Sequence, residues 1–333
     1  MKSYNITRKI ENNDIIYKTL HSLLCNTKNN IENCNNWEYY KRLCNPYETI
    51  YTSDKKKNIC LKIPISRSYF KLCEIMQDFK LNKKNEVVLC LAEAPGGFIE
   101  YIQENSYSSK IYANTYIKDE KNIPIWNKHI LNNYLIYFTN SNKNNGDLKN
   151  IDNINDIKIQ IQGDCDLITA DGGIDYSNDY NNQELDSYEL LYSEIYTALY
   201  CQKEGGCFII KFFDIFYNKT IQLLNILYRC YDNVSFTKPY TSRPSNSEKY
   251  IICQGFKSNK KILNLMKYNW NKKSDIEINV DYLFYKIIYN YNFIFVNEQI
   301  DFINNVLNKQ CDNICQKKLS LEWCKKYKMP YKI

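Results

Sequence analysis

Short apolar runs alternate with polar stretches and helix-length segments through the middle of the chain. Each apolar run has the length of a buried strand. The runs lie at residues 87–91, 110–116, 134–138, 166–170, 207–212, 234–238 and 250–253. Segments of helical length lie between some of them, at 183–202 and 218–230. Alternating strands and helices are typical of an α/β sheet, which we therefore expect at the centre of the fold.

The two ends of the chain differ from this centre. Residues 1–60 carry aromatic and apolar positions among many Asn and Lys residues, which predicts a helical, partly irregular N-terminal extension. Residues 258–333 are rich in Lys, Asn and Tyr and contain no glycine. We expect them to form a helical appendage packed on the central domain at 61–257. The polar segment 140–149 is too long for a tight turn and predicts a surface loop at the sheet's edge.

The composition excludes several classes of protein but does not identify a binding partner. At 333 residues the chain can bury a full core without disulfides or metal ions. Its 14 cysteines include no CxxC pair and it has only two histidines, so we expect reduced thiols, an intracellular compartment and no bound metal. Without a secretory signal or an apolar run of about eighteen residues, a soluble, non-secreted protein with no membrane partner is expected. The net charge of +7 only leans towards polyanionic partners.

A glycine-containing turn follows the first apolar run. The run at 87–91 ends in small residues and two glycines before a helical segment begins. Glycine lets the backbone approach a ligand closely, and this is the position of cofactor turns in open α/β sheets. The same residues would also suit an ordinary tight connection between a strand and a helix. The turn reads Ala92, Glu93, Ala94, Pro95, Gly96, Gly97 and Phe98.

Two other apolar runs end in charged side chains. Asp171 follows the run 166–170, at the carboxyl end of a strand, where ligands bind in open α/β sheets. The run 207–210 leads into Lys211, a charge that a purely structural strand does not need. Lys211 could instead reach solvent at the end of its strand. The combination of the two residues favours a functional site.

Two further polar features flank these runs. The proline-punctuated loop 238–248 ends in Glu248, directly before the last apolar run. This loop could bind an RNA backbone or be only a long hairpin. An amphipathic helical start at 66–75 carries Lys71, which without partners would be a solvated helix charge.

The motifs, their order and their spacing resemble the FtsJ-like family of ribose 2′-O-methyltransferases, and within it the cap-specific mRNA (nucleoside-2′-O)-methyltransferases. The similarity covers roughly residues 41–256. It implies a Rossmann-like methyltransferase fold, with a mostly parallel seven-stranded sheet flanked by helices and helical extensions at both ends. It also implies S-adenosylmethionine as cofactor, S-adenosylhomocysteine as product and no metal. The chain looks like a minimal form of the family, of viral or protist type.

The resemblance also implies roles for individual residues. The family's catalytic tetrad maps to Lys71, Asp171, Lys211 and Glu248, with Lys211 as general base. This role needs a neutral amine, and we expect Lys71, burial and the sulfonium charge of the cofactor to lower the pKa of Lys211. The implied cofactor-binding residues are Ser66, Ala92, Glu93, Ala94, Pro95, Gly96, Gly97, Phe98, Asp147, Leu148 and Asp171.

RNA contacts are implied on either side of the tetrad. The basic segment 41–48 resembles the asparagine-proline-tyrosine segment that touches substrate in cap enzymes. Here Lys41 stands where an arginine is usual, and lysine lacks the planar fork that grips a phosphate in two places. The implied RNA-contacting residues are Lys41, Arg42, Asn181, Arg243 and Asn246.

The expected function is methylation of the first transcribed nucleotide of capped mRNA. Methylation of the second nucleotide or of an internal ribose is an alternative, and a non-catalytic RNA-binding scaffold is another. A nicotinamide-dependent dehydrogenase would need GxGxxG, which the turn at 92–98 does not match. Capped mRNA is the expected partner, together with other capping or transcription machinery. The expected location is the nucleus in a cell, and the cytoplasm or virion for a cytoplasmic DNA virus.

Overall fold

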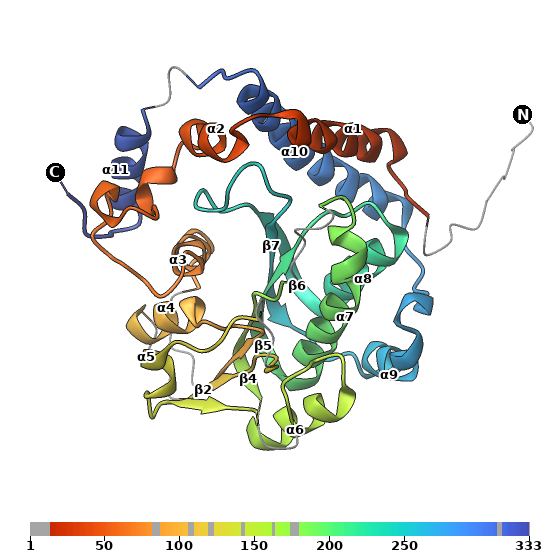
Figure 1. The fold of residues 1–333 in the computed structure, drawn as a ribbon. Coiled ribbons are helices and arrows are strands. Elements are labelled where there is room, and N and C mark those ends of the chain that lie inside the picture. The colour runs from red at the N-terminus through yellow and green to blue at the C-terminus, as the bar shows by residue number, and fades with distance from the viewer. Residues whose placement is uncertain are drawn as a thin grey trace, which may run out of the picture.

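The computed structural model describes residues 14–81, 87–105, 110–118, 123–140, 144–161, 164–173, 180–311 and 315–332, with backbone only at 274 and 275. At its centre lies a seven-stranded sheet in the order β3-β2-β1-β4-β5-β7-β6 (Figure 1). The strands are β1 (Val87–Leu91), β2 (Lys110–Ala113), β3 (Ile136–Phe138), β4 (Cys165–Ala170), β5 (Gln202–Phe212), β6 (Tyr231–Thr237) and β7 (Lys249–Phe256).

The strand directions bring several chain segments to one edge of the sheet. Strands β1 to β5 pair in parallel, so their carboxyl ends share that edge. Strand β7 runs antiparallel to β5, and its first residue, Lys249, lies opposite Phe212 at the end of β5. The loop that precedes β7 therefore meets the residues that follow β1, β4 and β5. This mixed, mostly parallel sheet confirms the fold expected from the sequence.

Helices cover both faces of the sheet, which explains the uninterrupted apolar runs. Leu89 and Leu91 of β1 pack among α6 (Ile151–Ile161), α7 (Gln183–Cys201) and α8 (Asn218–Cys230). Val88 and Cys90, which point to the opposite face, pack among α3 (Ser68–Asp78) and α4 (Gly97–Asn105). The result is a three-layer arrangement of helices, sheet and helices (Figure 1).

The terminal regions add helices around this unit. α10 (Tyr282–Leu307) lies against α1 (Lys18–Asn29) and α2 (Trp37–Cys44), across the top in Figure 1. Aromatic and apolar residues of α9 (Lys260–Tyr268), of α10 and of α11 (Gln316–Lys326) join the two main cores. The boundaries drawn at residues 60 and 257 stay predictions. Shorter helices are η1 (Asn30–Asn33), η2 (Glu48–Ile50), η3 (Lys55–Lys57), α5 (Lys128–Leu131) and η4 (Trp270–Asp275).

A disulfide joins these terminal regions, which the sequence did not predict. Cys44 at the end of α2 is bonded to Cys311 after α10, with their Cα atoms 4.8 Å apart. The other twelve cysteines form no disulfide. The expectation of reduced thiols is therefore wrong for this pair, because packing of the two termini brings together cysteines that are 267 positions apart.

The described part of the loop 140–149 is more buried than expected. Asn144 and Leu148 are both almost fully buried, and the Asn144 side chain accepts a hydrogen bond of 2.9 Å from the backbone N–H of Gly146. Side-chain amides thus satisfy backbone groups where the loop turns inwards, while Asn145 and Lys149 stay exposed. Within the described ranges, none of the helices combines the length and apolar character needed to cross a bilayer.

Candidate active site

The four charged residues singled out in the sequence meet at the carboxyl edge as two ion pairs. Lys71 Nζ of α3 lies 2.7 Å from Glu248 Oε1 and 2.8 Å from Oε2. Lys211 Nζ, near the end of β5, lies 3.2 Å from Asp171 Oδ1 and donates to the Asp171 carbonyl at 2.7 Å. The pairing of β5 with β4 and with β7 explains this convergence. The structure therefore brings together residues that are 177 positions apart.

Two hydroxyl groups that sequence reasoning missed hold the carboxylates in place. Tyr250 donates to Asp171 Oδ1 at 2.6 Å, and Ser242 donates to Glu248 Oε1 at 2.7 Å. Tyr250 lies opposite Lys211 in the register of β5 and β7. Only knowledge of that pairing could have placed its hydroxyl beside Asp171. Each carboxylate is thus fixed by a lysine and a hydroxyl.

The charges in this cluster stabilise one another. Burial opposes ionisation of Glu248, but Lys71 and Lys211 outweigh it and lower the pKa of Glu248 to about 2. Burial also disfavours the Lys211 ammonium, but Asp171, Glu248 and Glu194 together raise its pKa. The expectation that burial and Lys71 lower the pKa of Lys211 is therefore wrong for the protein by itself, because three carboxyl groups surround the amine.

Glu194 is a further ionisable group at the site, and no motif in the sequence marked it. It lies on α7 with only 1% of its surface exposed. Burial raises its pKa to about 8, although the Lys211 charge acts in the opposite direction. A Cβ atom on Gly172 would lie 2.2 Å from Glu194 Oε1, and one on Gly173 would lie 3.3 Å from Lys211 Nζ. The glycine pair thus leaves room for the acid on one side and the amine on the other.

The predicted cofactor turn connects β1 to α4. Gly96 has φ of +114°, a backbone conformation that favours glycine. A Cβ atom on Gly97 would lie 2.1 Å from the Ser66 hydroxyl, so Ser66 packs directly on the turn. Glu93 closes the turn by accepting a 2.6 Å hydrogen bond from the Phe98 N–H. The positive φ explains the glycine at position 96, and the close packing of Ser66 explains the glycine at position 97, without any contact with a ligand.

The residues around this turn fit S-adenosylmethionine. Glu93 Oε2 and Asn114 Oδ1 are buried and lack a hydrogen-bond partner among the described residues. Asn114 follows β2, accepts from the Glu93 N–H at 3.1 Å and donates to the Gly146 carbonyl at 3.4 Å. These bonds draw Asp147 and the buried Leu148 towards the turn. The unsatisfied polar atoms suit the amino and hydroxyl groups of the cofactor.

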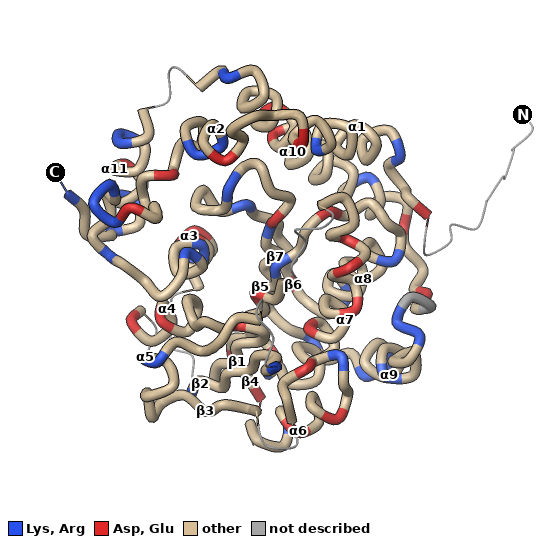
Figure 2. The backbone as a smooth tube through the Cα atoms, viewed as in Figure 1, with Lys and Arg blue, Asp and Glu red and all other residues tan. Residues whose placement is uncertain are grey.

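Three of the predicted RNA contacts gather around one carboxylate. Lys41 Nζ pairs with Glu38 on α2, and the hydrogen bond from Lys41 lowers the pKa of Glu38. The charges of Arg243 and Arg42 lower this pKa further, which places both near Glu38. Figure 2 shows Lys and Arg positions, in blue, on α2. The Lys41 amine is already paired, whereas Arg42 is exposed.

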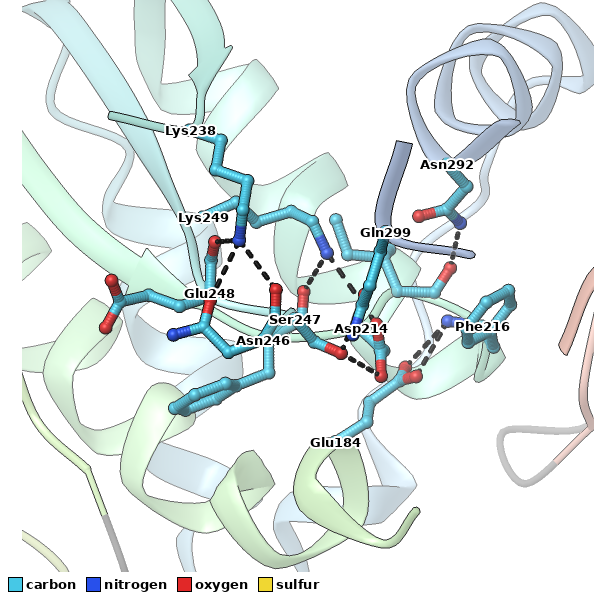
Figure 3. Close-up of polar contacts among 12 residues, drawn as sticks. Glu184, Asp214, Phe216, Lys238, Asn246, Ser247, Glu248, Lys249, Asn292 and Gln299 are labelled. Atoms are coloured by element: carbon cyan, nitrogen blue, oxygen red, sulfur yellow. Dashed lines mark hydrogen bonds and ion pairs between the residues drawn. The ribbon is translucent and has the colours of Figure 1, made fainter. Parts of the chain in front are cut away.

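The other two predicted RNA contacts are engaged within the protein. Asn181 Nδ2 donates to Asn29 Oδ1 of α1 at 2.8 Å. Asn246 is tied into its loop, because its Oδ1 accepts from Lys238 Nζ at 2.9 Å. Lys238 also donates to the carbonyls of Asn246 and Glu248, at 2.6 and 2.8 Å (Figure 3). Burial lowers the pKa of this lysine to about 7, and the sequence analysis gave it no role.

The described residues contain no group of three or more His, Cys, Asp or Glu side chains arranged to hold a metal ion.

Arg67 and Glu74 hold the loop before β7 from the side of α3. Arg67 donates to the Thr241 carbonyl at 2.7 Å, and Glu74 accepts from the Tyr240 and Thr241 N–H groups at 2.6 and 2.8 Å. The loop is thereby anchored on α3 as well as on Lys238.

Comparison with known proteins agrees with this geometry. The chain is 33% identical over 170 residues to "Cap-specific mRNA (nucleoside-2'-O-)-methyltransferase 1A" of Caenorhabditis briggsae, which covers 49% of this chain and 19% of the relative. It is 29% identical over 187 residues to "Cap-specific mRNA (nucleoside-2'-O-)-methyltransferase" of Autographa californica nuclear polyhedrosis virus, covering 56% and 71%. It is also 31% identical over 170 residues to "Inactive cap-specific mRNA (nucleoside-2'-O-)-methyltransferase 1B" of Caenorhabditis briggsae, covering 49% and 20%.

The chain spans about a fifth of the length of the two nematode relatives. Residues 64–256, which hold the whole sheet and all four residues of the two ion pairs, match the FtsJ-like methyltransferase family. This match covers more than half of the 333 residues. The chain therefore belongs to the FtsJ-like methyltransferase family.

Proposed function

We propose that this chain transfers a methyl group from S-adenosylmethionine to the ribose 2′-hydroxyl of the first transcribed nucleotide of capped mRNA. The observation that carries the proposal is the pair of largely buried lysine–carboxylate contacts, Lys71–Glu248 and Lys211–Asp171, at the edge that also holds the turn 92–98. The names of the similar nematode and baculovirus proteins support the choice of substrate.

The bound cofactor would supply a transferable methyl group on a positively charged sulfonium. The 2′-hydroxyl is a very weak acid, so its proton has to leave as the oxygen attacks. The ribose oxygen would take the methyl group in place of its proton, and Lys211 would accept that proton. Lys211 can do so only as a neutral amine. Its carboxylate neighbours oppose this state, whereas any positive charge that enters the site favours it.

The other residues of the cluster orient the reacting groups. Lys71 and Glu248 would hold the hydroxyl in line for attack, since alignment contributes a large part of the rate in such transfers. Asp171, itself fixed by Tyr250, keeps the Lys211 amine in place. The charges interact strongly, so protons bind to the cluster as a unit and not to independent residues.

RNA would enter along the face that carries α2 and the loop before β7. Arg42 and Arg243 are the proposed phosphate contacts, with Lys41 beside them. Such contacts position the strand without reading its sequence. Asn246 is a further candidate for a phosphate contact, and Asn181 is assigned to the neighbourhood of the acceptor nucleotide. The location in the nucleus, cytoplasm or virion stays a prediction.

Two alternatives to this function differ in the ribose that is methylated or in whether any methyl group is transferred. Methylation of the second nucleotide or of an internal ribose would use the same residues on a different strand position. A non-catalytic RNA-binding scaffold is the other alternative. The Caenorhabditis briggsae relative named as inactive supports it, because that relative is 31% identical to this chain and the 1A relative is 33% identical. The ion pairs favour catalysis, since a scaffold has no need of four charged side chains that are each no more than 15% exposed.

Labelled methyl transfer tests the proposal. The protein is incubated with tritiated S-adenosylmethionine and short RNAs that carry a 7-methylguanosine cap, an unmethylated cap or a triphosphate, and the label is mapped by nuclease digestion. Label on the first nucleotide of capped RNA is expected. Label on the second nucleotide or an internal ribose would change the substrate, and no transfer despite cofactor binding would favour the scaffold.

A matched pair of lysine variants tests the assigned base. Lys211→Ala should lower kcat by about 10²–10⁴-fold, the range for loss of a general base. Lys203→Ala on the same strand is the control, because Lys203 is 55% exposed and pairs only with Asp166 in the described structure. Full activity of Lys211→Ala would remove this residue from the proposed role.

A further inference from the structure

The proposed methyl transfer does not use Asp214, which lies three residues beyond Lys211. Asp214 is only 6% exposed, yet two lysines share its carboxylate. Lys28 Nζ lies 3.0 Å from Oδ2, and Lys249 Nζ lies 3.8 Å from Oδ1. Burial opposes the charge, but the two lysines hold the pKa of Asp214 below its usual range. A buried cluster of this kind is a costly way to gain stability, which suggests another use.

Asp214 contacts the two residues that flank Glu248 in the sequence, Ser247 and Lys249. Ser247 donates to Asp214 Oδ2 at 2.9 Å, and Lys249 donates to the Phe213 carbonyl while facing Asp214. Successive side chains in an extended segment point in opposite directions. When Ser247 and Lys249 are held on the side of Asp214, Glu248 must point the other way, towards Lys71. Figure 3 shows Glu248 directed away from Asp214 in this manner.

The same cluster reaches the N-terminal helix. Lys28 is part of α1, and its amine also donates to the Tyr180 carbonyl at 3.3 Å. The next residue, Asn181, bonds to Asn29 of α1. Helix α1 therefore reaches Ser247, the neighbour of Glu248, through Asp214, and it contacts the proposed RNA-binding residue Asn181 directly. Sequence pattern alone made this helix part of an extension outside the central domain.

Helix α10 completes the support from a third direction. Gln299 Nε2 donates to the Ser245 carbonyl at 2.9 Å, and its Oε1 lies 3.3 Å from the Ser247 hydroxyl. Asn292 Nδ2 donates to the Ile215 carbonyl, next to Asp214 (Figure 3). The segment that carries Glu248 is thereby tied to both terminal regions of the chain through buried polar contacts.

We propose that Asp214 and Lys28 are positioning residues, through which helix α1 fixes Glu248 against Lys71 and holds the Tyr180–Asn181 edge of the site. This inference rests on the proposed methyl transfer for its catalytic consequence. Its structural part, the control of the segment 242–248 by α1, does not depend on that function. On this account the N-terminal helix is part of the active-site architecture.

The kinetic test compares three variants on capped RNA. Asp214→Asn keeps the shape and removes the charge, Lys28→Met removes its partner, and Lys18→Met changes an exposed lysine of the same helix. A displacement of Glu248 by about 1 Å is enough for a loss of roughly 10²-fold. We expect such a loss in kcat for the first two variants, with KM for S-adenosylmethionine within about twofold of the unchanged protein. Lys18→Met should behave as the unchanged protein.

Hydrogen exchange separates the inference from the proposed function. Amides of residues 242–248 should exchange faster in Asp214→Asn and Lys28→Met than in Lys18→Met, at a temperature where all are folded. If the unchanged protein methylates no RNA but this exchange still increases, the methyl transfer is refuted and the control by α1 stands. Should Asp214→Asn fail to fold, Lys28→Met and Ser247→Ala provide the answer. Unchanged exchange and kcat within about twofold would overturn the inference.

Discussion

The buried side chain of Glu194, packed against Gly172, makes the folded protein less stable as pH rises. The pKa of Glu194 is raised from 4.5 to about 8 in the folded protein. Between these values the unfolded chain has released the proton while the folded protein retains it. The free energy of unfolding therefore falls with increasing pH across this window, and the contribution is complete only below pH 4.5.

The size of this effect follows from the pKa difference. Each unit corresponds to about 1.36 kcal/mol, so the loss from Glu194 is about 3 kcal/mol at pH 7 and about 5 kcal/mol above pH 8. Glutamine cannot ionise, has nearly the same shape as the protonated acid and can accept the N–H of Gly172 in the same way. Glu194→Gln should therefore be more stable than the unchanged protein at pH 8, by several kcal/mol, and similar to it at pH 5.

Urea unfolding at pH 5, 7 and 8.5 measures the difference directly. Glu189→Gln, an exposed residue of the same helix, is the matched control and should not change the pH dependence. The ionised Glu194 also favours the charged form of Lys211, so Glu194→Gln should move the acidic limb of kcat/KM to lower pH. Parallel pH dependences for Glu194→Gln and the unchanged protein would refute the assignment of a buried acid here.

Two further changes probe the ion pairs. Tyr250→Phe removes the hydroxyl that bonds the Asp171 carboxylate. Hydrogen bonds to charged groups contribute about 1.5–3 kcal/mol, so kcat in labelled methyl transfer should fall by roughly 10–100-fold, and an unchanged kcat would contradict this role. Glu248 has its pKa lowered from 4.5 to about 2, so it stabilises the folded state above pH 4.5, and about 3 kcal/mol is lost as pH falls towards 2. In acid unfolding followed by circular dichroism, Glu248→Gln should lack this part of the pH dependence, and an identical acid transition would refute it.

The apolar runs predicted most of the sheet, but they did not fix every boundary. The run 166–170 and the helix at 218–230 agree with β4 and α8 within one residue. Strand β5 begins at Gln202 instead of residue 207, because Gln202 pairs with Cys165 across a register shift and the strand continues through Gly205. Such irregular pairing depends on the neighbouring strand, so local hydrophobicity could not reveal it.

Some residues of the site could likewise be recognised from the local sequence, whereas others depend on contacts between distant segments. Lys71, Asp171, Lys211 and Glu248 could be singled out because the motifs that hold them resemble those of the family. Lys28 meets Asp214 across 186 positions, and nothing near Lys28 in the sequence marks it as buried. The pKa of Lys211 depends on the same long-range packing, because Asp171 and Glu248, which come from other parts of the chain, raise it most and Glu194 of α7 adds to their effect.

The central claim is that the acceptor is one ribose hydroxyl, and a single substitution in the RNA tests it most directly. Two RNAs with a 7-methylguanosine cap are compared, identical except that the first transcribed nucleotide has a ribose in one and a 2′-deoxyribose in the other. Transfer of the tritiated methyl group is expected to the first RNA and to stay at background for the second. Equal labelling of both RNAs would contradict the proposed reaction.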